Sequence, residues 1–212
     1  MANSSNNSTK PISIKRVSQI NGAYCGPATL VMLLSFLKIK ADQEKIIVDT
    51  HLSQKIMNYG MTIDDLGQII KTLYPQLQFW YKFNSTISDL SQMINTYNYP
   101  VGIEWQGIFD YSDNEDKSKL LYPDIDDDPG HVAIVTAIDT LNNTIKIADP
   151  DQHYFRKDRK FSILQFERRW WDINQIIDPN TKKTKEVDDY HPMFIITPKD
   201  TDFPQFLNMS KI

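Results

Sequence analysis

The sequence predicts an α+β domain, because helix patterns fill its first half and strand patterns fill its second half. Helical spacing of apolar residues is found between residues 25 and 96, and short runs rich in β-branched residues follow from residue 99 onward. Helices first and strands afterwards differ from the alternating order of a parallel α/β fold. The 212-residue chain suits one such domain with an elaborated loop.

Four helices are expected in the first half, over residues 25–37, 42–49, 62–74 and 88–96. The first is apolar almost all round after Cys25, which is typical of a helix buried on most faces. In the second, Ile46, Ile47 and Val48 are expected to face inward. The third begins at Thr62, whose spacing to the acidic residue three positions later fits a capping box.

The second half contains strand patterns over residues 99–105, 131–138, 144–149 and 193–196. The second and third of these are joined by a turn at residues 139–143 and predict a hairpin. A short helix rich in aromatic residues is expected at about 164–171. The aromatic groups Phe79-Trp80-Tyr81 and Trp170-Trp171 are interpreted as core rather than as a ligand site.

Composition excludes several classes of partner. The formal net charge is only -4, without a sustained Lys/Arg face, so neither nucleic acid nor an anionic membrane surface is an expected partner. No run is long and apolar enough to insert into a bilayer.

Residues 1–10 lack the apolar stretch of a secretory signal, so we expect a disordered leader and a cytoplasmic location, with export by a signal-independent route left open. Residues 11–212 are then one domain, with an acidic insertion at about 109–129.

The chain has one cysteine, so Cys25 is either an inert buried residue or a working thiol. It lies at the start of the first helix, where free backbone N–H groups and the helix dipole favour a thiolate. Gly26 would allow a substrate to approach closely, and Pro27 suits a first helical turn. Taken alone, an inert cysteine is the more common outcome.

The predicted hairpin changes that balance. His131 begins its first strand, directly after Gly130 in a turn that would expose the imidazole, and Asp149 ends the returning strand. In an antiparallel hairpin, the start of one strand lies near the end of the other, so these side chains are expected to meet. Alternation places residues 131, 133, 135 and 137 on one face, with residues 145, 147 and 149 likewise on one face. Asp151 is the alternative carboxylate.

Together these residues provide the parts of nucleophilic catalysis. The imidazole takes the thiol proton, and the carboxylate fixes the tautomer of the ring. Gln19, six residues before Cys25, could donate its side-chain amide to an oxyanion beside the Cys25 backbone N–H. Gly130, directly before His131, is expected with Gly26 to contact the substrate. Trp105, at a strand end, could also line the cleft, although packing is the safer interpretation. No cofactor is required.

Three blocks carry a family resemblance: residues 19–30 (QINGAYCGPATL), 130–135 (GHVAIV) and 147–150 (IADP). In content, order and Gln-to-Cys spacing they resemble the bacteriocin-processing peptidases. These are papain-like enzymes, often fused to export transporters, that cut leader peptides after a double glycine. The resemblance implies a papain-like fold and a peptide or protein substrate. It also implies an oxyanion donor and triad at Gln19, Cys25, His131 and Asp149.

Two departures keep the substrate and reaction open. Tyr24 stands where typical members have an acidic residue, and residues 23–26 (AYCG) are also similar to the opening of phytochelatin synthases, which are papain-fold transpeptidases. The alternatives to hydrolysis are therefore acyl transfer through the same acyl-enzyme, or a non-catalytic peptide-binding module. The sequence does not indicate an oligomeric state.

The acidic loop before His131 contains an Asp124-x-Asp126-x-Asp128 pattern, but Pro129 and Val135 stand where a calcium loop needs glycine and glutamate. We therefore expect no metal site there. The loop is interpreted as a solvated segment, and a rim that prefers basic substrates is its less favoured role.

Overall fold

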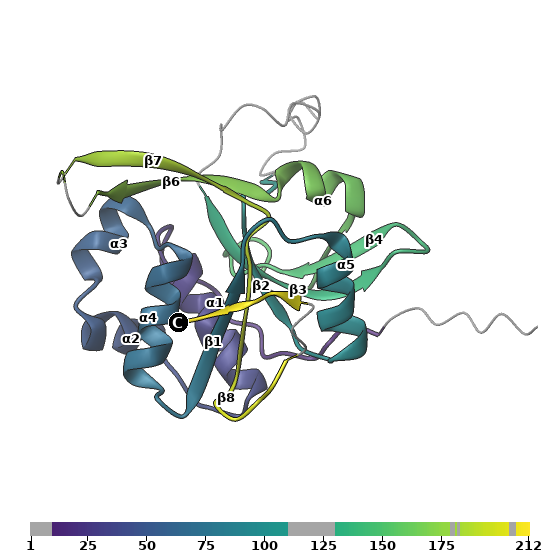
Figure 1. The fold of residues 1–212 in the computed structure, drawn as a ribbon, viewed down its shortest axis with the longest axis horizontal. Coiled ribbons are helices and arrows are strands. Elements are labelled where there is room, and N and C mark those ends of the chain that lie inside the picture. The colour runs from purple at the N-terminus through teal and green to yellow at the C-terminus, as the bar shows by residue number, and fades with distance from the viewer. Residues whose placement is uncertain (1–9, 110–129, 179–180, 182, 204–206) are drawn as a thin grey trace, which may run out of the picture.

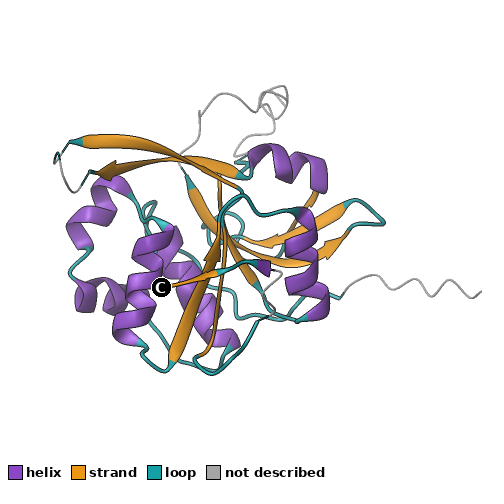
Figure 2. Ribbon diagram, in the orientation of Figure 1, coloured by secondary structure: helices purple, strands orange, loops and turns teal. Residues whose placement is uncertain are grey.

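The computed structural model describes residues 10–109, 130–178, 181, 183–203 and 207–212, and the expected leader and most of the acidic insertion lie outside these ranges. The mixed helical and antiparallel architecture confirms the α+β prediction. Strands cross the middle of the molecule, with helices grouped on both sides of them (Figures 1 and 2).

The helical segments are α1 (Cys25–Phe36), α2 (Gln43–Thr50), α3 (Ser53–Tyr59), α4 (Ile63–Leu73), α5 (Ile87–Ser91), η1 (Gln92–Thr96) and α6 (Ile163–Arg169). The four helices expected in the first half are confirmed, the last of them divided into α5 and a π-helical turn, η1. Thr62 does form a capping box at the start of α4. Helix α3 was not predicted, because it buries only Ile56 and so has little apolar periodicity. The inward placement of Val48 was wrong, since its side chain is 63% exposed.

The strands are β1 (Leu77–Lys82), β2 (Val101–Trp105), β3 (His131–Asp139), β4 (Thr144–Ala148), β5 (Arg159–Ser162), β6 (Trp171–Ile177), β7 (Thr184–Tyr190), β8 (Met193–Pro198) and β9 (Ser210–Lys211). Seven of them form one antiparallel sheet in the order β5-β4-β3-β2-β8-β1-β9, and β6 pairs with β7 alone. The final predicted strand, β8, lies inside this sheet between β2 and β1.

Each face of the sheet has its own hydrophobic core. Along β3, Val132 and Ile134 belong to the core shared with α1, α2 and α4. Ala133 and Val135 alternate with them and belong to the core shared with α5, η1 and α6. Both faces of the central strands are therefore buried, which explains why these segments are almost uniformly apolar in sequence.

The β3–β4 hairpin contains a bulge that the sequence did not indicate. Val135 pairs with Ile147 and Ala137 with Lys146, so Thr136 is the extra residue. Its carbonyl accepts a hydrogen bond from the Ile12 backbone N–H at 2.8 Å. The bulge reverses the alternation, so the expected placement of Ala137 on the His131 face was wrong.

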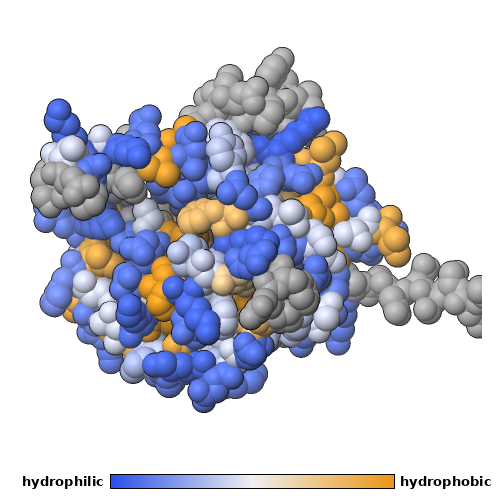
Figure 3. All heavy atoms as spheres, viewed as in Figure 1, coloured by the Kyte–Doolittle hydropathy of each residue, from blue (hydrophilic) through white to orange (hydrophobic). Residues whose placement is uncertain are grey.

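On the face shown in Figure 3, hydrophobic side chains form separate small patches within a mainly hydrophilic surface. Within the described ranges, no helix combines the length and apolar character that a membrane-spanning segment requires.

Candidate active site

Cys25 is the first residue of α1, and its side chain is partly exposed. The approach to the helix is a turn in which the Asn21 side-chain oxygen accepts from the Ala23 backbone N–H at 3.0 Å. The thiol therefore lies at the positive end of the helix dipole while remaining accessible to a reagent or substrate.

A buried hydrogen bond fixes α1 against β3. The Thr29 hydroxyl donates to the Val132 carbonyl at 3.0 Å. Thr29 is one turn after Cys25, and Val132 directly follows His131. The contact joins residues far apart in sequence and holds the thiol beside the imidazole.

His131 and Asp149 meet as the hairpin predicted. His131 Nε2 lies 2.8 Å from Asp149 Oδ1. The two residues are only 5% and 1% exposed, so the expectation that the turn would expose the imidazole was wrong. Because Ile134 pairs with Ala148, Asp149 follows opposite Ala133, diagonally across from His131. Asp151, the alternative carboxylate, instead accepts from the His153 backbone N–H.

The electrostatics favour a thiolate–imidazolium pair. Burial alone would raise the pKa of Cys25, but the hydrogen bond and positive charge of His131 outweigh it and lower the thiol pKa below its ordinary value. Burial would likewise lower the pKa of His131, but Asp149 and Cys25 raise it to about 10. Burial opposes ionisation of Asp149 as well, yet His131 and Arg159 hold its pKa well below the ordinary value.

Arg159 is a part of this site that the sequence did not reveal. Its Nη1 donates to Asp149 Oδ2 at 2.7 Å, and its Nη2 donates to the Ile108 carbonyl. The guanidinium also lies over the Tyr154 ring, 3.8 Å from its centroid. Arg159 comes from β5, a strand without a clear apolar pattern, so no local signal connected it with Asp149.

Gln19 is buried in a loop held against the segment that follows Asp149. Its backbone N–H donates to the Pro150 carbonyl at 2.8 Å, directly after Asp149. The Gln43 amide holds the preceding residue by donating to the Ser18 carbonyl. Within the described part of the chain, the buried Oε1 of Gln19, an acceptor, has no hydrogen-bond partner.

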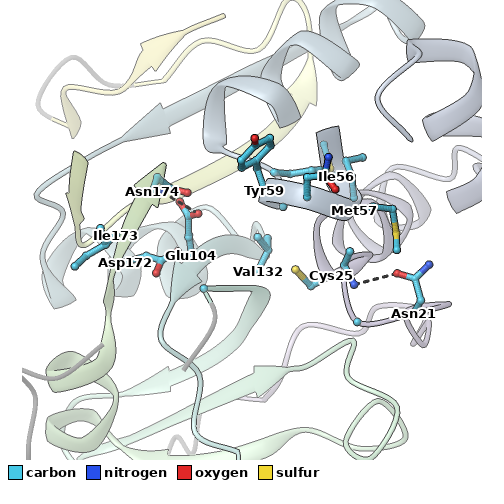
Figure 4. A pocket seen from close by; sticks show the side chains of 16 residues that line it. Asn21, Cys25, Ile56, Met57, Tyr59, Glu104, Val132, Asp172, Ile173 and Asn174 are labelled. Atoms are coloured by element: carbon cyan, nitrogen blue, oxygen red, sulfur yellow. Dashed lines mark hydrogen bonds between the residues drawn. The ribbon is translucent and has the colours of Figure 1, made fainter. Parts of the chain in front are cut away.

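A cleft of about 700 Å³ opens beside the thiol. Cys25, Asn21 and Met57 line one side, and Glu104, Asp172 and Asn174 line the other, with Val132 between them (Figure 4). The sequence missed the second wall, because Asp172 and Asn174 belong to the unpredicted β6–β7 hairpin.

The three expected substrate contacts have different outcomes. Gly130 lines the cleft, but an added Cβ would lie 1.7 Å from the Asp172 carboxylate, so this glycine makes room for β6. A Cβ on Gly26 would meet Met61 and Leu66 at 3.1 and 3.2 Å. Protein atoms thus occupy the space that was assigned to substrate, and the interpretation of Gly26 was wrong.

Trp105 is also a correction. It is 0% exposed and packs against Phe161 and Phe166 on the face opposite the cleft. Alternation along β2 explains this result, because it is the neighbouring Glu104 that lies on the cleft side. Of the aromatic groups interpreted as core, Phe79, Trp80 and Trp170 are buried in the cores. Tyr81 packs partly buried against one core, whereas Trp171 is only partly buried and belongs to neither, so its placement in the core was wrong.

In the described ranges, no three His, Cys, Asp or Glu side chains are grouped so that they could hold a metal ion. The acidic loop considered for calcium lies outside those ranges.

Comparison with known proteins now adds to this geometry. The Peptidase_C39 like family model matches residues 11–177. The chain belongs to the Peptidase_C39 like family. Membership in this family supports a cysteine peptidase-like role and confirms the resemblance drawn from the three sequence blocks. A search of curated protein sequences found no match.

Two solved structures share the papain-like fold that the family implies. One is a double glycine motif protease from an AMS/PCAT transporter in complex with the leader peptide, with 16% identity, a TM-score of 0.53, and coverage of 91% of this chain and 96% of that chain. The other is the peptidase domain of Streptococcus ComA, a bifunctional ABC transporter of a quorum-sensing pathway. Its identity is 16%, its TM-score is 0.53, and coverage is 87% and 98%. At this identity the likeness establishes the fold.

Proposed function

We propose that this protein is a cysteine peptidase that cleaves a peptide or amide bond through a Cys25-His131-Asp149 triad and an acyl-enzyme. The observation that carries the proposal is the position of His131, which hydrogen-bonds to Asp149 and lies near enough to Cys25 to lower the pKa of its thiol. Each contact raises the pKa of the imidazole, and the thiol pKa falls in response.

The first step is attack of the Cys25 thiolate on the carbonyl carbon of the substrate. Because Nε2 of His131 is engaged by Asp149, the other ring nitrogen is the one available to the thiol and substrate. The protonated imidazole gives its proton to the leaving amine as the carbon–nitrogen bond breaks. The acyl group remains on Cys25 as a thioester.

The negative charge on the substrate oxygen needs hydrogen-bond donors in this step. We assign this role to the Cys25 backbone N–H, which lies at the free end of α1, and to the Gln19 side-chain amide. The firm attachment of the Gln19 backbone to Pro150, directly after Asp149, supports the assignment.

In the second step, His131 removes a proton from water, which attacks the thioester and releases the acid and the thiol. An amine acceptor in place of water would give acyl transfer instead. The related protease solved with its leader peptide supports a peptide as the substrate class.

The deciding measurement is the rate of iodoacetamide alkylation of Cys25 against pH. We expect the wild type to react well below the ordinary thiol pKa, and His131→Ala to lose that reactivity. His153→Ala is the matched control, since this histidine is exposed and pairs with Asp151 outside the triad. A wild-type profile that matches a free thiol, with no effect of His131→Ala, would leave a non-catalytic binding module.

Catalysis is then tested with a peptide library that includes double-glycine leader sequences, with Cys25→Ala as the inactive control. Mass spectrometry in oxygen-labelled water separates the two reactions. Label in the new carboxyl group indicates hydrolysis, whereas products joined to an added amine indicate acyl transfer.

A further inference from the structure

The far wall of the cleft contains a buried carboxylate that the triad does not use. Glu104 lies on β2 directly opposite Val132 of β3, and it is 2% exposed. Its Oε1 accepts from the Asn174 amide at 3.2 Å, while Oε2 has no hydrogen-bond partner in the described structure. A buried carboxylate oxygen without a partner is costly, so a ligand that supplies a donor gains strongly.

The surroundings of Glu104 are negative. Asp172, on β6, also lines the cleft, and its Oδ1 accepts from the Gln106 amide at 2.8 Å. Asp189, on β7, accepts from the same Asn174 amide at 3.0 Å. Burial, Asp172 and Asp189 together raise the pKa of Glu104 well above its ordinary value, and no ion pair to Glu104 exists among the described residues. A positive charge is therefore what this wall lacks.

We propose that Glu104 and Asp172 form a subsite that binds a lysine or arginine side chain of the peptide substrate beside Cys25. The inference rests on the proposed peptidase function and names a substrate preference of the same cleft. Burial of Glu104 favours a charge at the end of a long, slender side chain, which can reach the wall while its backbone stays near the thiol. Asn174 orients the carboxylate, so the subsite is already formed before substrate binds (Figure 4).

A chemical probe tests this preference without knowledge of the natural substrate. Alkyl methanethiosulfonates of two to six carbons, each with a terminal ammonium or a terminal methyl group, react with Cys25 to form a mixed disulfide and release methanesulfinate. The measured quantity is the ratio of the two second-order rates at each length. In the wild type we expect the ammonium reagents to react faster, with the ratio largest at the length that reaches Glu104.

Glu104→Gln keeps the size of the side chain and its acceptor for Asn174, but it cannot become the negative carboxylate that pairs with the ammonium group. We expect it to lower the ratio at the optimal length at least about tenfold, since buried charge pairs usually contribute this much or more. Glu167→Gln, on the exposed face of α6, changes the net charge equally and is expected to leave the ratio unchanged. A ratio that is the same in the wild type and in Glu104→Gln overturns the subsite.

Asp172→Asn is the second variant and keeps the oxygen that accepts from Gln106. It is expected to lower the ratio less than Glu104→Gln, and it keeps the test decisive should Glu104→Gln fail to fold. The absolute rate with the methyl reagents, and its dependence on His131, reports on the proposed triad instead. If the triad proposal is wrong, the absolute rates match those of an ordinary thiol, but the ratio of ammonium to methyl rates can still be measured. If the subsite proposal is wrong, that ratio does not change in Glu104→Gln. The two outcomes are therefore distinguishable.

Discussion

The hydroxyl of Thr29 donates a hydrogen bond to the carbonyl of Val132, 3.0 Å away, and this bond joins α1 to the sheet at β3. Both residues are almost wholly buried, at 0% and 2% exposure. The bond lies one helical turn from Cys25 and one residue from His131, so we expect the spacing of these two residues to depend on it.

We therefore expect Thr29→Val to damage the site as well as the fold. The Val132 carbonyl would be buried without its partner, which costs about 1–3 kcal/mol. Thermal unfolding should report the lower stability, and alkylation of Cys25 at low pH should slow. Ser35→Ala removes a hydrogen bond within the same helix, to the Met32 carbonyl, and should leave alkylation unchanged. Equal effects of the two variants would argue against the positioning role.

The pH dependence of alkylation and of turnover should separate at high pH. The lowered pKa of Cys25 means that alkylation rises below the ordinary thiol value of about 8.5 and then stays high, because the thiolate persists. Turnover needs the imidazolium as acid, so it should decline as His131 loses its proton near pH 10. Parallel rate profiles from pH 4 to about 11 check this, and joint decline of both rates would contradict it.

Asp149→Asn should lower turnover roughly 10²–10⁴-fold, the usual contribution of a positioned acid and base. Without the carboxylate, the pKa of His131 falls, so the alkaline limb of turnover moves to lower pH. The sign for stability follows from the lowered pKa of Asp149: its contribution is present above the unfolded value of about 3.9 and is lost on acidification. The difference in unfolding free energy between wild type and variant should therefore shrink below about pH 4.

Arg159 is expected to act as a positioning residue through Asp149. Arg159→Met removes the cation that holds the second oxygen of the Asp149 carboxylate. We therefore expect a change in the pH at which turnover declines on the alkaline side. Arg159→Lys keeps the charge but not the two-sided contact with Asp149 and Ile108, and should recover part of the activity. A purely structural role would lower the melting temperature without moving the pH profile.

Gly130 and Gly22 both line the cleft and provide a matched pair. A methyl group on Gly130 would collide with Asp172, whereas one on Gly22 would meet nothing within 4 Å. Gly130→Ala should therefore displace β6 and weaken both turnover and the preference for cationic reagents, while Gly22→Ala should be nearly neutral. Similar behaviour of the two variants would show that Asp172 is not fixed against this turn.

Much of the site could be predicted because its residues carry local signals. Cys25 precedes a strongly apolar helix, and His131 and Asp149 stand at opposite ends of a hairpin whose strands and turn are visible in sequence. Periodicity and turn chemistry depend only on neighbouring residues, so they determined α1, α4, β3 and β4 before any contact was known. The bulge at Thr136, whose carbonyl accepts from the distant Ile12 N–H, was missed because one extra residue in a strand leaves the local apolar pattern almost unchanged.

The sequence by itself determined which chemical groups are present and in which local elements they begin: a thiol at a helix start, an imidazole and a carboxylate on one hairpin. Only the tertiary structure decided that Arg159 holds Asp149, that Glu104 rather than Trp105 lies on the cleft side, and that β6 brings Asp172 to the wall. These outcomes depend on packing between segments far apart in the chain. The pattern of neighbouring residues does not determine which distant segments pack together or in which register.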